Sequence, residues 1–104
     1  MIRKAIIMNV FPEAFDEYIK RHNEIWPELK DAIKAHGGQN YSIFLCRETS
    51  QLFGYIEVKN EAHWQKIAQT KIMQKWWKYM DPLMETQENN QPITKDLEEV
   101  FYLE

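Results

Sequence analysis

The sequence is poor in cysteine and glycine, and both shortages narrow the class of protein it encodes. Of its 104 residues, 1 is cysteine and 3 are glycine. The lone Cys46 excludes an internal disulfide framework and a zinc site built on cysteines. With so little glycine, the chain has no glycine-rich phosphate-binding loop. We therefore expect a cytoplasmic protein that folds without disulfides.

Long apolar runs and an excess of one charge are also missing. No stretch approaches the roughly 18 apolar residues of a membrane-spanning helix. The apolar run around Ile6 is too short for the core of a signal peptide. Lys and Arg number 13 against 16 Asp and Glu, a formal charge of -3. Neither sign gathers into a long run, so neither a nucleic acid nor a membrane is an expected partner.

Aromatic residues, in contrast, are abundant. They make up 13% of the chain, with 4 Trp, 5 Tyr and 5 Phe. So many wide rings must line a core, an interface or a pocket. The chain length is enough for one hydrophobic core, so we expect a single domain spanning residues 1–104.

Hydrophobic patterning predicts four strands separated by two helical regions. The predicted strands cover residues 2–10, 40–46, 52–58 and 100–103. The first strand is apolar without a helical period, which is typical of burial on both faces. The polar residues 47–51 join the second and third strands as a hairpin. Residues 85–95 are polar and predict a loop before the last strand.

The first helical region runs from Pro12 to the Gly37 turn, with apolar side chains at three- and four-residue steps. Pro27 cannot donate a backbone hydrogen bond, which predicts a kink or restart at residues 23–26. Asn60 and Thr70 are suitable caps for the second helical region.

This order of elements predicts an α+β, ferredoxin-like βαββαβ fold with a four-stranded antiparallel sheet. Two helical regions can cover only one face of such a sheet. The other face would present some of Phe44, Phe53, Tyr55 and Phe101 to water. Because soluble monomers rarely expose such a patch, we predict a homodimer whose partner covers it.

Catalytic motifs with fixed spacing are absent, so candidate residues must be argued singly. His22, His36 and His63 are too far apart to form a local metal-ligand pair on one helix, and no metal is expected. His22 lies on the helical stripe that faces the sheet, where it can act as a general acid or base. The alternative is a core histidine hydrogen-bonded to a backbone carbonyl. His36 and His63 fit ordinary surface positions.

Four aromatic residues complete the candidate site. Tyr18 lies one helical turn before His22, and Tyr41 begins the second strand. The adjacent rings of Trp76 and Trp77 diverge on a helix, so one can pack in the core while the other lines a cleft. Core packing is the alternative for each. Together they suit a small ligand with one apolar side and several hydroxyls, such as a sugar.

Several aromatic-rich blocks carry a family resemblance. They lie at residues 1–5, 18–29, 40–41, 76–80 and 99–103. In this order, and over essentially the whole chain, the sequence resembles the L-rhamnose mutarotases. The resemblance implies an isomerase that interconverts the α and β anomers of L-rhamnose, on a homodimeric ferredoxin-like α/β barrel without metal or organic cofactor. It further implies that His22 is the proton donor and that the sugar contacts are Tyr18, Tyr41, Trp76 and Trp77.

Other functions remain open at this point. One is a cofactor-independent monooxygenase or haem-binding protein of the same dimeric barrel type. Another is a sugar sensor that binds without catalysing. The partner base for mutarotation is unassigned, and a tyrosine, a carboxylate or water can each fill that role.

Overall fold

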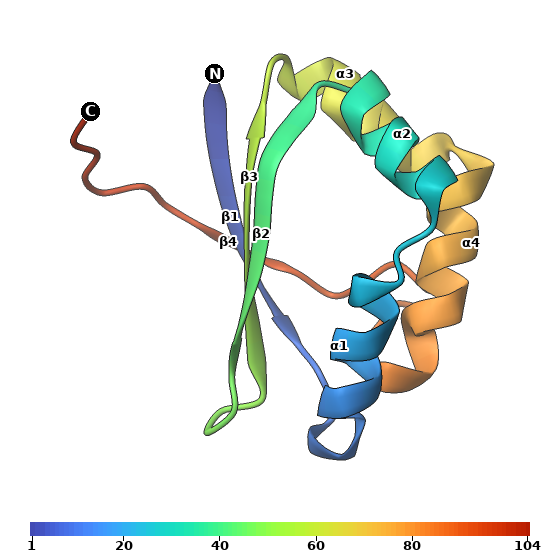
Figure 1. Ribbon diagram of the computed structural model, residues 1–104. Helices are drawn as coiled ribbons and strands as arrows, with labels where there is room; N and C mark the ends of the chain where they lie inside the picture. Colours follow the sequence, from blue (N-terminus) through green and yellow to red (C-terminus); the bar gives the residue numbers. More distant parts are fainter.

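A four-stranded antiparallel sheet carries all the helices on one of its faces (Figure 1). The computed structural model describes residues 1–104. The strands are β1 (Ile2–Asn9), β2 (Gly38–Cys46), β3 (Gln51–Val58) and β4 (Lys95–Leu97), in the sheet order β2-β3-β1-β4. Strand order and helix placement are those of the ferredoxin-like fold, which confirms the predicted α+β class.

The helices form a second layer over the sheet. They are α1 (Phe15–Asn23), α2 (Pro27–Ala35), α3 (Glu61–Gln65) and α4 (Lys71–Met80), with short 3-10 turns η1 (Pro12–Ala14), η2 (Lys66–Gln69) and η3 (Asp81–Leu83). Trp26 is extended, with φ -65° and ψ 133°, and Pro27 begins α2 as its first residue. The kink or restart predicted at residues 23–26 is therefore a complete break between α1 and α2. His22 lies in the last turn of α1. No helix is both long and apolar enough to cross a bilayer.

Both predicted helix caps are present. The Asn60 side chain accepts a hydrogen bond from the backbone N–H of His63 at 2.8 Å. The Thr70 hydroxyl accepts one from the N–H of Met73 at 3.3 Å. Each cap satisfies one of the N–H groups that the first turn of a helix leaves without a partner. Thr70 thereby fixes the start of α4, the helix that carries both tryptophans of the candidate site.

Replacing Thr70 by alanine is expected to lower the free energy of unfolding by about 1 kcal/mol, because the cap at the start of α4 is lost. Urea denaturation at fixed protein concentration measures the change. Thr70→Ser keeps the hydroxyl and is the matched control. An alanine variant as stable as the serine variant would contradict the assignment of this cap.

The core lies between the sheet and the helices. In β3 the alternate residues Leu52, Ile56 and Val58 are buried, and Leu52 packs in one core cluster with Leu29 of α2 and Met80 of α4. Half-buried and buried residues alternate strictly along β3, and the sequence shows the same two-residue period. β1 differs from the prediction of burial on both faces, because most of its residues are only half-buried and Met8 is its one buried residue.

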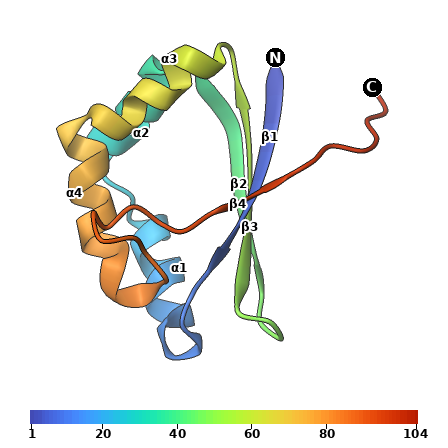
Figure 2. The same cartoon turned by 180° about the vertical axis from the view of Figure 1, so that it is seen from behind.

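The predicted last strand at residues 100–103 is wrong. The fourth strand is β4, where Leu97 pairs with Ala5 and Lys95 with Ile7. The segment before it, residues 84–94, returns from the helix layer to this edge of the sheet (Figure 2). The apolar composition of residues 100–103 suggested a strand, but they find no strand to pair with in this chain.

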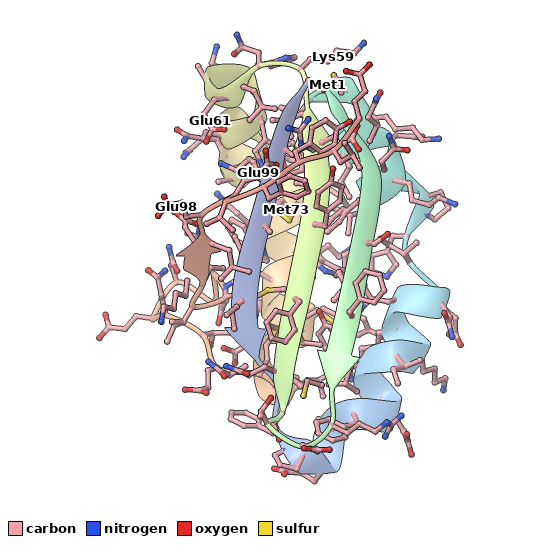
Figure 3. The ribbon with its side chains drawn as sticks, turned by 90° about the vertical axis from the view of Figure 1, so that its left-hand side faces the viewer. Met1, Lys59, Glu61, Met73, Glu98 and Glu99 are labelled. Carbon is pink, nitrogen blue, oxygen red and sulfur yellow. The ribbon has the colours of Figure 1, made fainter.

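Residues 98–104 instead form a tail that leaves the sheet on the side opposite the helices (Figure 1). Figure 3 looks onto this side and labels Glu98 and Glu99, where the tail begins. The Arg3 guanidinium holds the Glu99 carboxylate through two hydrogen bonds of 2.8 Å and lies 3.5 Å from the ring centroid of Tyr102. Val100 and Phe101 remain 88% and 77% exposed.

The sheet face without helices, which we call the open face, carries the four aromatic residues expected there or next to it. Phe44 is 66% exposed and Phe101, in the tail, is 77% exposed. Phe53 and Tyr55 of β3 are half-buried and lie on the side opposite the core. The predicted apolar patch is therefore present.

Candidate functional site

A cavity of about 970 Å³ lies between the helices and the inner face of the sheet. Its wall includes all five residues singled out from the sequence: Tyr18, His22, Tyr41, Trp76 and Trp77. They come from α1, β2 and α4, so residues far apart in the chain meet at one place. A concave, largely apolar wall with a few polar groups is typical of a small-molecule site.

His22 is held by a backbone hydrogen bond on one side of its ring. Its Nδ1 lies 3.1 Å from the carbonyl oxygen of Tyr18, one helical turn earlier. In the neutral imidazole, Nδ1–H donates this bond and Nε2 carries the lone pair. The ring is therefore hydrogen-bonded to a backbone carbonyl, and it also lines the cavity, where an acid–base group would have to lie.

The surroundings of His22 favour its neutral form. The ring stacks on Tyr18 with centroids 4.3 Å apart and meets the edge of Trp76 at 5.3 Å. Burial lowers the pKa of His22 below its ordinary value of 6.5, and the hydrogen bond to the Tyr18 carbonyl opposes this only in part. At neutral pH, Nε2 is thus a proton acceptor, and it becomes a strong donor once protonated.

Tyr18 and Tyr41 supply hydroxyl groups to the same cavity. Burial raises the pKa of both, and the neighbouring Tyr41 raises that of Tyr18 further. Both phenols therefore stay protonated and can donate hydrogen bonds at neutral pH. Tyr41 as a whole residue is 43% exposed, although its side chain lines the cavity.

A β-bulge lies at Tyr41. The pairing of β2 with β3 shifts between Gln39 and Ser42, and Asn40 has a positive φ of 52°. Bulges commonly redirect a side chain beside a binding site. The sequence predicted the strand and the face of Tyr41 but gave no signal for the bulge.

The two tryptophans have different environments. Trp76 is 7% exposed and meets Trp26 edge-to-face at 5.0 Å, with Tyr79 also beside both rings. Trp77 is half-buried, and it borders both the main cavity and a smaller neighbouring one. Trp76 therefore supports the site from the core, and Trp77 is the more accessible wall.

Arg21 fixes α1 against the end of α4, a role that sequence reasoning missed. Its guanidinium donates to the carbonyl of Tyr79, lies 4.0 Å from that ring centroid and pairs with Glu17 at 2.7 Å. Because His22 is the next residue, this link also fixes the position of the histidine. The i,i+4 spacing of Glu17 and Arg21 was visible in the sequence, but the partner on α4 was not.

The charged groups of the wall are all basic. Lys4, Lys30 and Lys34 line the cavity, and no Asp or Glu does. Lys4 pairs with Glu61, and this lowers the pKa of that carboxyl group. A carboxylate of this chain is therefore not in place to act as the partner base.

The two histidines outside the cavity wall belong to no metal site. His36 and His63, predicted at the surface, face each other with ring centroids 5.3 Å apart. No cluster of three or more His, Cys, Asp or Glu side chains is arranged to hold a metal ion.

The fold and the cavity define a small α+β protein whose cavity wall holds one imidazole and two phenols, a set of groups that suits a hydroxylated small molecule. The chain belongs to the L-rhamnose mutarotase family, because the family model described as L-rhamnose mutarotase matches residues 3–103. It is 55% identical over 104 residues to the L-rhamnose mutarotase of Oceanobacillus iheyensis, covering 100% of both chains. It is 56% identical over 103 residues to that of Listeria monocytogenes, covering 99% of both.

Solved structures agree with this assignment. The crystal structure of an L-rhamnose mutarotase from Formosa agariphila is similar over 100% of both chains, with a TM-score of 0.92 and 36% identity. A dimeric ferredoxin-like protein from an uncultured marine organism matches 91% of this chain and 85% of its own, with a TM-score of 0.56 and 14% identity. The second likeness concerns the fold alone. These comparisons do not support the alternative of a monooxygenase or haem-binding protein.

Proposed function

We propose that this protein interconverts the α and β anomers of L-rhamnose by opening and reclosing the pyranose ring. The observation that carries the proposal is the placement of His22 in the cavity of a chain that matches L-rhamnose mutarotases over its full length. The enzyme is an isomerase and works in the cytoplasm, where a free thiol such as Cys46 stays reduced.

Ring opening needs one proton removed and one proton delivered. The anomeric hydroxyl loses its proton, C1 becomes a carbonyl, the bond from C1 to the ring oxygen breaks, and that oxygen is protonated. Rotation about C1–C2 exposes the other carbonyl face, and reclosure by the reverse steps gives the other anomer. General acid–base catalysis typically contributes about 10²- to 10⁴-fold to such a reaction.

His22 delivers the proton to the ring oxygen in this mechanism. Because its neutral form is favoured, Nε2 first takes the proton of the anomeric hydroxyl and then passes it to the ring oxygen. Both oxygens are bonded to C1, so one nitrogen can reach both. The absence of Asp and Glu from the wall supports this single-residue shuttle over a separate carboxylate base.

Three of the other four residues hold the sugar, and the fourth supports His22. Tyr18 and Tyr41 donate hydrogen bonds to its hydroxyls, since both phenols remain protonated. Trp77 packs on the apolar side of the ring, including the methyl group at C6, and Trp76 supports His22 from behind. Such positioning adds to the acid–base contribution.

NMR exchange spectroscopy on L-rhamnose tests the proposed function. The protein is expected to speed magnetisation transfer between the two anomeric proton signals in proportion to its concentration. A sugar sensor would bind L-rhamnose and broaden its signals without changing the exchange rate. That result would show that the protein is a sugar sensor and not a mutarotase.

We further propose that two copies pair through their open faces. The chain exposes 7268 Å², whereas a folded monomer of its mass is expected to expose roughly 6,200 Å². The excess of about 1,000 Å² is comparable to the roughly 800 Å² that each partner buries in a standard interface. Phe44 and the apolar residues of the tail are exposed and would contribute to such an interface.

Light scattering is expected to give twice the chain mass of 12.6 kDa for the wild type. Phe44→Asp places a charge on the open face, at the edge strand β2, and is expected to yield a monomer at micromolar concentration. Ala62→Asp changes the charge on exposed α3 and is the control, expected to remain dimeric. A wild-type monomer would refute the pairing.

A further inference from the structure

A second cavity of about 590 Å³ adjoins the first. Ala68, Trp77 and Gln91 belong to the walls of both. The two spaces therefore meet at these three residues, so a ligand seated in the main cavity can extend past Trp77 into the second. This neighbouring space has no part in the proton transfer, because its wall contains no histidine or tyrosine.

Side-chain carboxamides dominate the wall of the second cavity. They belong to Gln69, Gln74, Asn89, Asn90 and Gln91. Each carboxamide offers a donor and an acceptor side by side, which suits the neighbouring hydroxyls of a sugar. The indole of Trp77 adds the flat apolar surface against which a pyranose ring can pack. The chemistry of this wall is thus that of a second sugar-binding position.

Some of these amides are already oriented by the backbone. The Gln74 amide nitrogen donates to the carbonyl of Ala68 at 3.1 Å, which leaves its oxygen free to accept. The Asn89 side-chain oxygen accepts from the N–H of Gln91 at 3.1 Å, which leaves its amide nitrogen free to donate. One free acceptor and one free donor thus come from opposite sides of the cavity, α4 and the 85–94 loop.

The charge of the second cavity is positive. Lys75 and Lys78 of α4 are in its wall, and no acidic residue is. Neither lysine takes part in the ion pairs of the structure, which join Arg3 to Glu99, Lys4 to Glu61 and Arg21 to Glu17. A neutral sugar needs no such charge, whereas a carboxylate on the sugar gains a charge-assisted hydrogen bond from it.

We propose that the second cavity binds a hexuronic acid linked to L-rhamnose through a hydroxyl other than the anomeric one. The enzyme then also mutarotates the reducing-end rhamnose of such acidic disaccharides. The inference rests on the proposed function, since the rhamnose ring occupies the main cavity with its anomeric centre at His22. The size of the main cavity agrees with this proposal, because its volume suits a ligand larger than one deoxyhexose.

Three sugars test the subsite: free L-rhamnose, a uronosyl-rhamnose, and the same disaccharide with its carboxylate reduced to a neutral alcohol. The wild type is expected to act on the uronosyl form with a KM about tenfold below that of the neutral form. Lys78→Met is expected to remove most of this difference and to leave the rate on free L-rhamnose unchanged. Lys71→Met, on the same helix but outside both walls, is the control.

Titration calorimetry with the two disaccharides separates failure of the subsite from failure of the proposed function. If free L-rhamnose is not turned over, the proposed function is wrong, and tighter binding of the uronosyl form that depends on Lys78 still supports the subsite. If the uronosyl form binds no tighter than the neutral form, the subsite is wrong whatever the activity on L-rhamnose. Equal effects of Lys78→Met and Lys71→Met would also overturn it.

Discussion

Replacing His22 by alanine is expected to lower the rate of enzyme-catalysed anomer exchange by about 10²- to 10⁴-fold, the usual contribution of a positioned acid–base group. The variant loses the one imidazole in the cavity wall, and the tyrosines cannot replace it as a base because burial keeps both hydroxyls protonated. NMR exchange between the two anomers of L-rhamnose measures the loss.

His22→Gln separates chemistry from packing, because it keeps a polar side chain that can still donate to the Tyr18 carbonyl. It is expected to be as inactive as the alanine variant while binding L-rhamnose. His63→Ala alters a histidine outside the cavity wall and is the control, with wild-type activity expected. Full activity in either His22 variant would remove this residue from the acid–base role.

The pH dependence distinguishes the shuttle from a simple acid. A shuttle starts from neutral His22, so kcat/KM depends on the fraction of neutral ring. Because burial lowers the pKa of His22, we expect kcat/KM to stay level from pH 7.5 to about 6.5 and to fall only below that value. A rate that rises as the pH falls through 6.5 would instead show that imidazolium is the starting form.

Replacing Trp76 by alanine is expected to lower the free energy of unfolding by about 3–5 kcal/mol, the usual loss for a large core residue. Trp76 is 7% exposed and contacts the rings of His22, Trp26 and Tyr79. Its loss leaves a cavity at the junction of α1, α2 and α4 and also frees the His22 ring. Thermal and urea unfolding at fixed protein concentration measure the change in stability.

Trp77→Ala is the matched comparison, because it removes the neighbouring indole from a half-buried position. It is expected to cost less stability than Trp76→Ala and to raise the KM for L-rhamnose while the protein stays folded. If instead Trp77→Ala destabilises the protein more than Trp76→Ala, the assignment of Trp76 to the core and of Trp77 to the cavity wall is wrong. Measuring both stability and KM keeps the two roles apart even when the Trp76 variant unfolds.

Much of the candidate site could be predicted because it depends on local spacing. Tyr18 and His22 are one helical turn apart, so a helix was enough to place them on one face. The break at Pro27 followed from its missing N–H, and the caps at Asn60 and Thr70 followed from their side-chain oxygens. The residue-by-residue roles in catalysis came from the family resemblance.

The fourth strand shows where local reasoning fails. Residues 100–103 are apolar and suggested a strand, yet the ladder forms at Lys95–Leu97. Lys95 and Asp96 have low strand propensity, but they lie opposite β1 when the chain returns from α4. Pairing with β1, which is distant in the sequence, therefore determined which residues form the fourth strand.

The sequence by itself determined the types of the long elements, the α+β class and the inner faces of β2 and β3. It did so because helical and strand periodicities are local and each buries one face. Only the tertiary structure decided that Arg21 joins α1 to Tyr79, that the wall around His22 is free of acidic residues, and that Trp77 separates two cavities. These features depend on contacts between segments far apart in the chain, whose geometry no single periodicity specifies.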